Sequence, residues 1–196
     1  EIQTSTLRYS DGYRRLFYGN NQGTYTEQSR IDLNFNASAV ARSGGDLQQA
    51  SISMGSLGNF DLIHQLQNEV AELPQKAVDF LAAPQVAGGE YTVILDPILA
   101  GVFVHEAFGH LSEADHVYEN PNLREVMVLG RRFGGKHLNI VDGAKIPGLR
   151  GSFRYDEEGM EAQRTDLIRE GILVGRLHSR ETAAMMNELP SGNARA

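Results

Sequence analysis

The chain has 196 residues, with 18 Lys and Arg against 25 Asp and Glu, and its formal net charge at pH 7 is −7. Hydrophobic residues at 41% and charged residues at 22% are typical of a folded globular protein and exclude disordered, collagen-like and disulfide-rich classes. The acidic balance argues against direct nucleic-acid binding, because that affinity comes mostly from Lys and Arg. The chain has no cysteine, which favours a cytoplasmic protein. No apolar run is long enough to span a membrane, so no membrane binding is expected.

The first 57 residues are predicted to be mostly β-structure. Apolar and polar residues alternate from Ile31 to Ala39 and again from Ala50 to Met54, which predicts a hairpin around residues 43–46. A shorter pair, residues 14–18 and 24–28, predicts another ribbon of the same antiparallel sheet. We therefore expect an α+β fold, with a β-hairpin region at residues 1–57 and a continuous α+β region at residues 58–196.

Changes of periodicity predict the later elements. Apolar residues three or four apart in residues 59–83 predict an amphipathic helix that kinks or breaks at Leu73, before Pro74. Residues 91–95 predict a buried strand, against which a helix beginning at Pro97 packs. We then expect a strand at residues 137–141, a turn at residues 156–159, a hairpin around residues 169–171 and a helix near residues 181–187.

The helix after Pro97 carries His105, Glu106 and His110 in the pattern His-Glu-x-x-x-His. Neutral imidazoles are good zinc ligands, and a glutamate beside the first ligand can take a proton from a metal-bound water. Five residues of α-helix turn a side chain by roughly 140°, so the two imidazoles would face apart. Five residues of a π-type turn bring it round to roughly 50°. The sequence therefore predicts a widened or unwound turn at residues 108–110.

Other polar residues are candidates for supporting roles. Glu113 and Asp115 follow His110 and could orient the imidazoles or supply an oxygen ligand. The alternative is that His105 and His110 are core histidines that hold no metal. The remaining candidates are the acidic turn at residues 156–158 and four further histidines, His64, His116, His137 and His178.

Residues 105–115 resemble the His-Glu-x-x-x-His segment of the TldD/PmbA family, once called modulators of DNA gyrase and now regarded as zinc metalloproteases. Residues 91–97, 151–159, 167–173 and 191–196 resemble the same family in the same order. The resemblance implies that His105 and His110 bind zinc and that Glu106 is the general base of a TldD-type, catalytic subunit. It also implies peptide or unfolded-protein substrates and a cytoplasmic dimer, formed by two copies or with another family member.

The chain departs from the family in one ligand and in its length. The third zinc ligand of the family is a cysteine far downstream of the second histidine, so it is expected beyond Ala196. Family members are more than twice as long, and we expect this chain to be a central fragment that is inactive alone. A noncatalytic peptide-binding or assembly module of a TldD/PmbA-type dimer, whose β-ribbons add a strand to a partner, stays open as the alternative.

Overall fold

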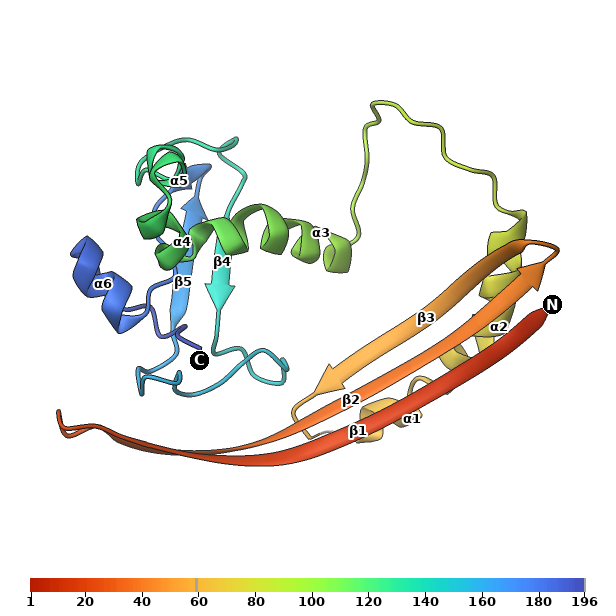
Figure 1. The fold of residues 1–196 in the computed structure, drawn as a ribbon, viewed down its shortest axis with the longest axis horizontal. Coiled ribbons are helices and arrows are strands. Elements are labelled where there is room, and N and C mark those ends of the chain that lie inside the picture. The colour runs from red at the N-terminus through yellow and green to blue at the C-terminus, as the bar shows by residue number, and fades with distance from the viewer. Residues whose placement is uncertain (59, 196) are drawn as a thin grey trace. The chain divides into compact units, whose positions relative to one another are not determined.

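The computed structural model describes residues 1–58 and 60–195 and confirms the α+β fold. Its two sheets each have three strands, in the orders β1-β2-β3 and β4-β5-β6 (Figure 1). The chain forms two compact units. The first contains residues 1–15, 29–91 and 148–150, and the second contains residues 16–28, 92–147 and 151–196.

The predicted ribbons form one sheet of long strands, β1 (Ile2–Gly19), β2 (Tyr25–Ser43) and β3 (Asp46–Ser56). β2 and β3 pair antiparallel, and Ser43 lies opposite Asp46 at the turn. Gly44 has a φ of 59° there, a conformation that glycine adopts without steric cost. The shorter ribbon is confirmed too, but β1 begins far earlier than predicted, at Ile2.

The core of the first unit lies between β2, β3 and two helices, α1 (Asp61–His64) and α2 (Gln67–Ala82). The alternation predicted the buried face of the sheet correctly, except that Ile31 is exposed. The buried residues of this core are Phe35, Ala37, Ala39, Ala41 and Ala50 of the sheet and Leu73 and Ala77 of α2. Alanines predominate on β2, which lets the helix approach the sheet closely.

Of the kink or break predicted at Leu73, the break is wrong, because α2 runs as one helix through Pro74. Leu73 and Ala77, on either side of the proline, are both buried against the sheet. Their burial offsets the backbone hydrogen bond that proline removes. The interruption lies earlier, at residues 65–66 between α1 and α2; Asn59, where the predicted helix begins, lies outside the described residues.

The second unit packs short helices against the sheet β4 (Ile140–Gly143), β5 (Arg164–Arg169) and β6 (Ile172–Leu173). The helices are α4 (Ala114–Glu119), α5 (Pro121–Val126) and α6 (Arg180–Met186). These elements confirm the predicted hairpin and last helix, while the strand predicted at residues 137–141 is shifted to Ile140–Gly143. The buried core contains Val117, Met127, Ile140, Leu167, Ile168 and Leu173.

The strand predicted at residues 91–95 is wrong, and so is the packing of the next helix against it. These residues have no regular secondary structure, and the side chain of Ile94 is 99% exposed. A short apolar run fits a strand, but a strand also needs a neighbour to hydrogen-bond, which periodicity does not reveal.

None of the helices in the described part of the chain combines the length and the apolar character that a membrane-spanning helix requires.

Candidate metal centre

The helix that leads to the candidate site is α3 (Pro97–Val104). Its first turn is fixed by Asp96, whose carboxylate accepts hydrogen bonds from the backbone N–H of Ile98 (2.9 Å) and of Leu99 (3.1 Å). Pro97 occupies the first helical position, where its missing N–H costs nothing. The predicted start of this helix at Pro97 is therefore confirmed, and the structure adds Asp96 as its capping residue.

A π-helical turn, His105–Gly109, follows α3 without a break. The backbone N–H of His110 donates to the carbonyl of His105, five residues back, and a 3₁₀ turn, His110–Ser112, comes next. The predicted widened turn is confirmed, although it begins at His105 rather than at Phe108. Gly109 has ordinary helical angles, and a Cβ there would lie 3.4 Å from Nδ1 of His105, at the near limit of ordinary van der Waals contact.

The π turn brings the three residues of the motif together. His105, Glu106 and His110 each offer a ligand atom, and these atoms lie within 4.8 Å of one another. The two imidazole rings meet edge to face, with centroids 4.5 Å apart. All three side chains are exposed, so the histidines are not the core residues of the alternative interpretation. This donor set suits zinc, which binds imidazole nitrogen and carboxylate oxygen.

Phe108 anchors the π turn from its other side. Its ring meets Phe133 edge to face at 5.4 Å, and it packs with Val104 against the core of the second unit. The turn therefore partly buries its aromatic residue and exposes its polar ones. That division follows from the sequence, in which Phe108 is the large apolar residue of the motif.

Glu113 lies against the second histidine of the motif. Its Oε1 is 2.8 Å from Nδ1 of His110, and its Oε2 is 3.5 Å from Nδ1 of His116. An ionised carboxylate only accepts hydrogen bonds, so the ring nitrogen of His110 that faces it carries the proton. The lone pair of Nε2 is then available to a metal, which is the arrangement that an orienting carboxylate would produce.

Asp115 and His116 also lie near the motif. Asp115 accepts a hydrogen bond from the backbone N–H of His116 (2.9 Å), and Glu113, Asp115 and His116 form a second group with metal-ligating atoms. From the sequence, His116 was only one of four further candidate histidines. Its spacing of three residues from Glu113, which is itself three residues from His110, was the available signal, because such residues are neighbours on a helical turn.

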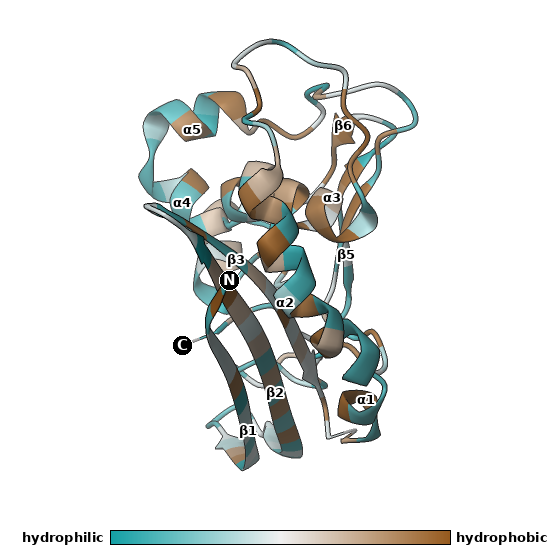
Figure 2. Cartoon of the chain, turned by 90° about the vertical axis from the view of Figure 1, so that its right-hand side faces the viewer, coloured by the Kyte–Doolittle hydropathy of each residue, from teal (hydrophilic) through white to brown (hydrophobic). Residues whose placement is uncertain are grey.

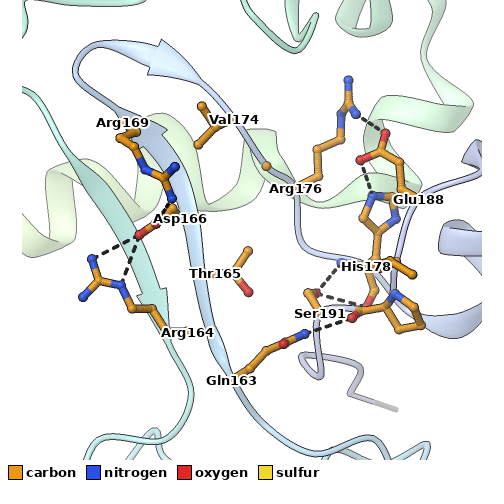
Figure 3. Close-up of a pocket in the computed structure, with 13 residues that line it drawn as sticks. Gln163, Arg164, Thr165, Asp166, Arg169, Val174, Arg176, His178, Glu188 and Ser191 are labelled. Atoms are coloured by element: carbon orange, nitrogen blue, oxygen red, sulfur yellow. Dashed lines mark hydrogen bonds and ion pairs between the residues drawn. The ribbon is translucent and has the colours of Figure 1, made fainter.

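The acidic turn at residues 156–159 has a structural use. The carboxylate of the buried Asp156 accepts hydrogen bonds from the backbone N–H groups of Glu158 (3.0 Å), Met160 (2.8 Å) and Ala194 (3.1 Å). The last of these ties two of the family-like segments, residues 151–159 and 191–195, to each other. His178 is buried as well and takes part in a hydrogen-bonded cluster on the far side of β5 from β4 (Figure 3).

The helix before the motif presents apolar side chains to the surrounding space. Figure 2 shows α3 mostly in the brown of hydrophobic residues, and Ile98 is 82% exposed. Leu99, Val102 and Phe103 are exposed too. A helix that is apolar all round is typical of a domain interior.

Comparison with known proteins identifies the family. The PmbA/TldA metallopeptidase C-terminal domain matches residues 88–196, and the central domain of the same family matches residues 2–83. A metalloprotease of Synechocystis is 49% identical over 195 residues, which is all of this chain and 42% of the relative. A zinc metalloprotease TldD homologue of Saccharolobus solfataricus is 30% identical, over all of this chain and 44% of its own length.

Solved structures show the same fold. A candidate modulator of DNA gyrase from Thermotoga maritima matches with a TM-score of 0.77 at 20% identity, over 98% of this chain and 44% of that protein. TldE from Thermococcus kodakarensis matches with a TM-score of 0.65 at 16% identity, over 97% and 42%. The chain thus spans less than half the length of these relatives. Its two domain matches and its close relatives show that it belongs to the PmbA/TldD metallopeptidase family.

Proposed function

We propose that this chain is the metal-binding segment of a longer, zinc-dependent metallopeptidase that cleaves peptide or unfolded-protein substrates. The observation that carries the proposal is the π turn, which gathers His105, Glu106 and His110 within 4.8 Å on an exposed surface. Relatives named metalloprotease and zinc metalloprotease support the same activity.

The three side chains have separate roles in this proposal. His105 and His110 hold the ion through ring nitrogens, and Glu113 fixes the tautomer of His110 from behind. Glu106 takes a proton from the attacking water and delivers it to the leaving amine. When bound, zinc supplies Lewis-acid chemistry, which makes water a better nucleophile and a peptide carbonyl a better electrophile.

The ligand set is incomplete within these residues, since catalytic zinc normally has three protein ligands. The family resemblance assigns the third position to a cysteine, and the present sequence contains none. We propose that this cysteine lies in the remainder of the protein. We also propose that the active assembly is a dimer, of two copies or with a TldE-like partner, and that it works in the cytoplasm.

Metal analysis and peptide cleavage test the proposal on the protein that contains this segment. We expect bound zinc, cleavage that a chelator abolishes, and a loss of about 10²-fold or more in kcat for Glu106→Gln with zinc retained. Glu119→Gln is the matched control, because it removes one exposed carboxylate at the end of α4. Cleavage that survives in Glu106→Gln would remove Glu106 as the general base, and cleavage that survives in the presence of chelator would contradict a zinc-dependent reaction. The absence of both zinc and cleavage in the wild type would favour the noncatalytic binding module.

A further inference from the structure

A buried, charged cluster lies beside β5 and has no part in the proposed chemistry. The side chains of Arg176 and His178 are 8% and 2% exposed, and both bind the carboxylate of Glu188 (Figure 3). Arg176 Nη1 donates to Glu188 Oε1, and Nε2 of His178 lies 3.1 Å from Oε2. Arg176 Nη2 also donates to the carbonyl of Met127 (2.7 Å). Loss of either contact to Glu188 would leave a further buried polar group unpaired, beside Nε of Arg176, which has no hydrogen-bond partner among the described residues, so these contacts are costly to break.

The cluster holds Leu177 in place from both sides. Leu177 lies between Arg176 and His178 in the chain, and its own N–H and carbonyl point to a different segment. Its N–H donates to the carbonyl of Ser112 (2.8 Å), and its carbonyl accepts from the N–H of Ala114 (2.9 Å). These two bonds form a parallel bridge between Leu177 and Glu113. Glu113 is therefore fixed through its two chain neighbours.

The fixed position of Glu113 determines how His110 is presented. The carboxylate of Glu113 lies 2.8 Å from Nδ1 of His110, which places the proton on that nitrogen and leaves Nε2 as the ligand atom. Because the Glu113 side chain is only partly buried, packing alone does not hold it there. Its backbone is held instead by Leu177.

We propose that Arg176, His178 and Glu188 are positioning residues for the metal centre, which act on His110 through the backbone of Leu177 and the carboxylate of Glu113. The inference rests on the proposed function, in which His110 is a zinc ligand. It adds residues that none of the spacing arguments connects to the motif, since they lie 66 to 78 positions farther along the chain.

Histidine side-chain NMR of the metal-free chain tests the inference directly. At alkaline pH, where imidazole is neutral, long-range nitrogen–proton couplings report which ring nitrogen of His110 carries the proton. We expect the Nδ1–H form to dominate in the wild type and a mixture of both forms in Glu188→Gln. Glu161→Gln is the matched control, because it removes a carboxylate from an exposed ion pair with Lys145.

Zinc titration followed on the same resonances gives a second readout. We expect Glu188→Gln and Glu113→Gln each to weaken zinc binding about tenfold, the range seen when partners of metal-bound histidines are removed. The double variant should be no weaker than Glu113→Gln, because both changes act through one carboxylate. A purely structural role of Glu188 would give additive losses, and that result would overturn the inference.

The fold of each variant is checked on the amide resonances of β5. If Glu188→Gln does not fold, Glu188→Asp, which keeps the charge, replaces it in the same set of single and double variants. An unchanged tautomer in a folded variant, or loss of the fold in both, would show that the cluster only stabilises the unit. If the longer protein that contains this segment binds no zinc at His110, the proposed function fails, while the metal-free tautomer still decides whether the cluster positions His110.

Discussion

Gly171, in the hairpin between β5 and β6, should be the glycine of this unit least able to accept a side chain. Its φ is 79°, and an added Cβ would lie 2.1 Å from the carbonyl oxygen of Gly134 and 2.6 Å from that of Gly135. Both obstacles are backbone atoms, so they cannot rotate away. The same glycine accepts hydrogen bonds from the N–H of Phe133 (2.7 Å) and of Gly134 (3.2 Å), and donates to the carbonyl of Leu138 (2.8 Å).

The expected cost of Gly171→Ala follows from these contacts. The left-handed backbone costs an alanine about 1 kcal/mol, and displacement of the loop breaks at least two hydrogen bonds worth about 1 kcal/mol each. The sum is roughly 3 kcal/mol. Gly130→Ala is the control, because Gly130 has a φ of 88° in the segment between α5 and β4, which also contains Gly134 and Gly135, and nothing lies within 4 Å of its Cβ position. It should lose only about 1 kcal/mol.

Urea unfolding, followed on the amide resonances of β5, compares the two variants within one unit. A difference of about 2 kcal/mol lowers the midpoint of Gly171→Ala by roughly 1 M more than that of Gly130→Ala. Equal midpoints would refute the reasoning, since they would mean that the loop yields to the new methyl group without losing its hydrogen bonds.

Three further predictions concern the metal centre and the sheet. The 196-residue chain alone should bind zinc weakly, because it supplies fewer than three protein ligands. Calorimetric titration of zinc into this chain and into the longer protein should show much tighter binding by the longer protein. Equal, tight affinities would mean that a third ligand lies among these 196 residues. Gly109→Val should weaken zinc binding, because the Cβ position already lies 3.4 Å from Nδ1 of His105 and the two further methyl groups need additional room beside that ring. Gly101→Val on α3 is the control and should not weaken it, because nothing lies within 4 Å of its Cβ position. The hydrogen bond from Arg30 lowers the pKa of Asp32, so the stability from this pair is complete above the ordinary aspartate pKa and is lost as pH falls through the lowered one. A carboxyl NMR titration should show a higher pKa for Asp32 in Arg30→Gln; an unchanged pKa would remove Arg30 as its cause.

The sequence was most informative where one residue pattern has one physical solution. Strict alternation from Leu33 to Ala39 left a single way to bury the apolar face of β2, and the structure buries it so. The five-residue spacing of His105 and His110 likewise admitted convergence only through a widened turn, which is present. In both cases the geometry is local, so the residues themselves contain the information.

The sequence was least informative where a residue's environment comes from distant parts of the chain. Residues 91–95 have the composition of a strand, yet a strand depends on a hydrogen-bonding neighbour that composition does not reveal. The pairing of Arg176 with Glu188 joins residues twelve positions apart through the fold. Pro74 does not end α2, because the burial of Leu73 and Ala77 against the sheet outweighs the low helix propensity of proline.

The extra residue of the π turn also determines the rotation, about the helix axis, of the segment that follows it. Removal of Ala107 would leave two histidines four apart, which converge on the same face of an ordinary α-helix without any distortion. Each residue of such a helix advances the chain by about 100°, so the deletion would rotate Glu113 and α4 by that angle relative to α3. The bridge from Leu177 to Glu113 could then no longer form in register. The fifth residue is thus required less by the two histidines than by the angular position of the segment that supports the second one.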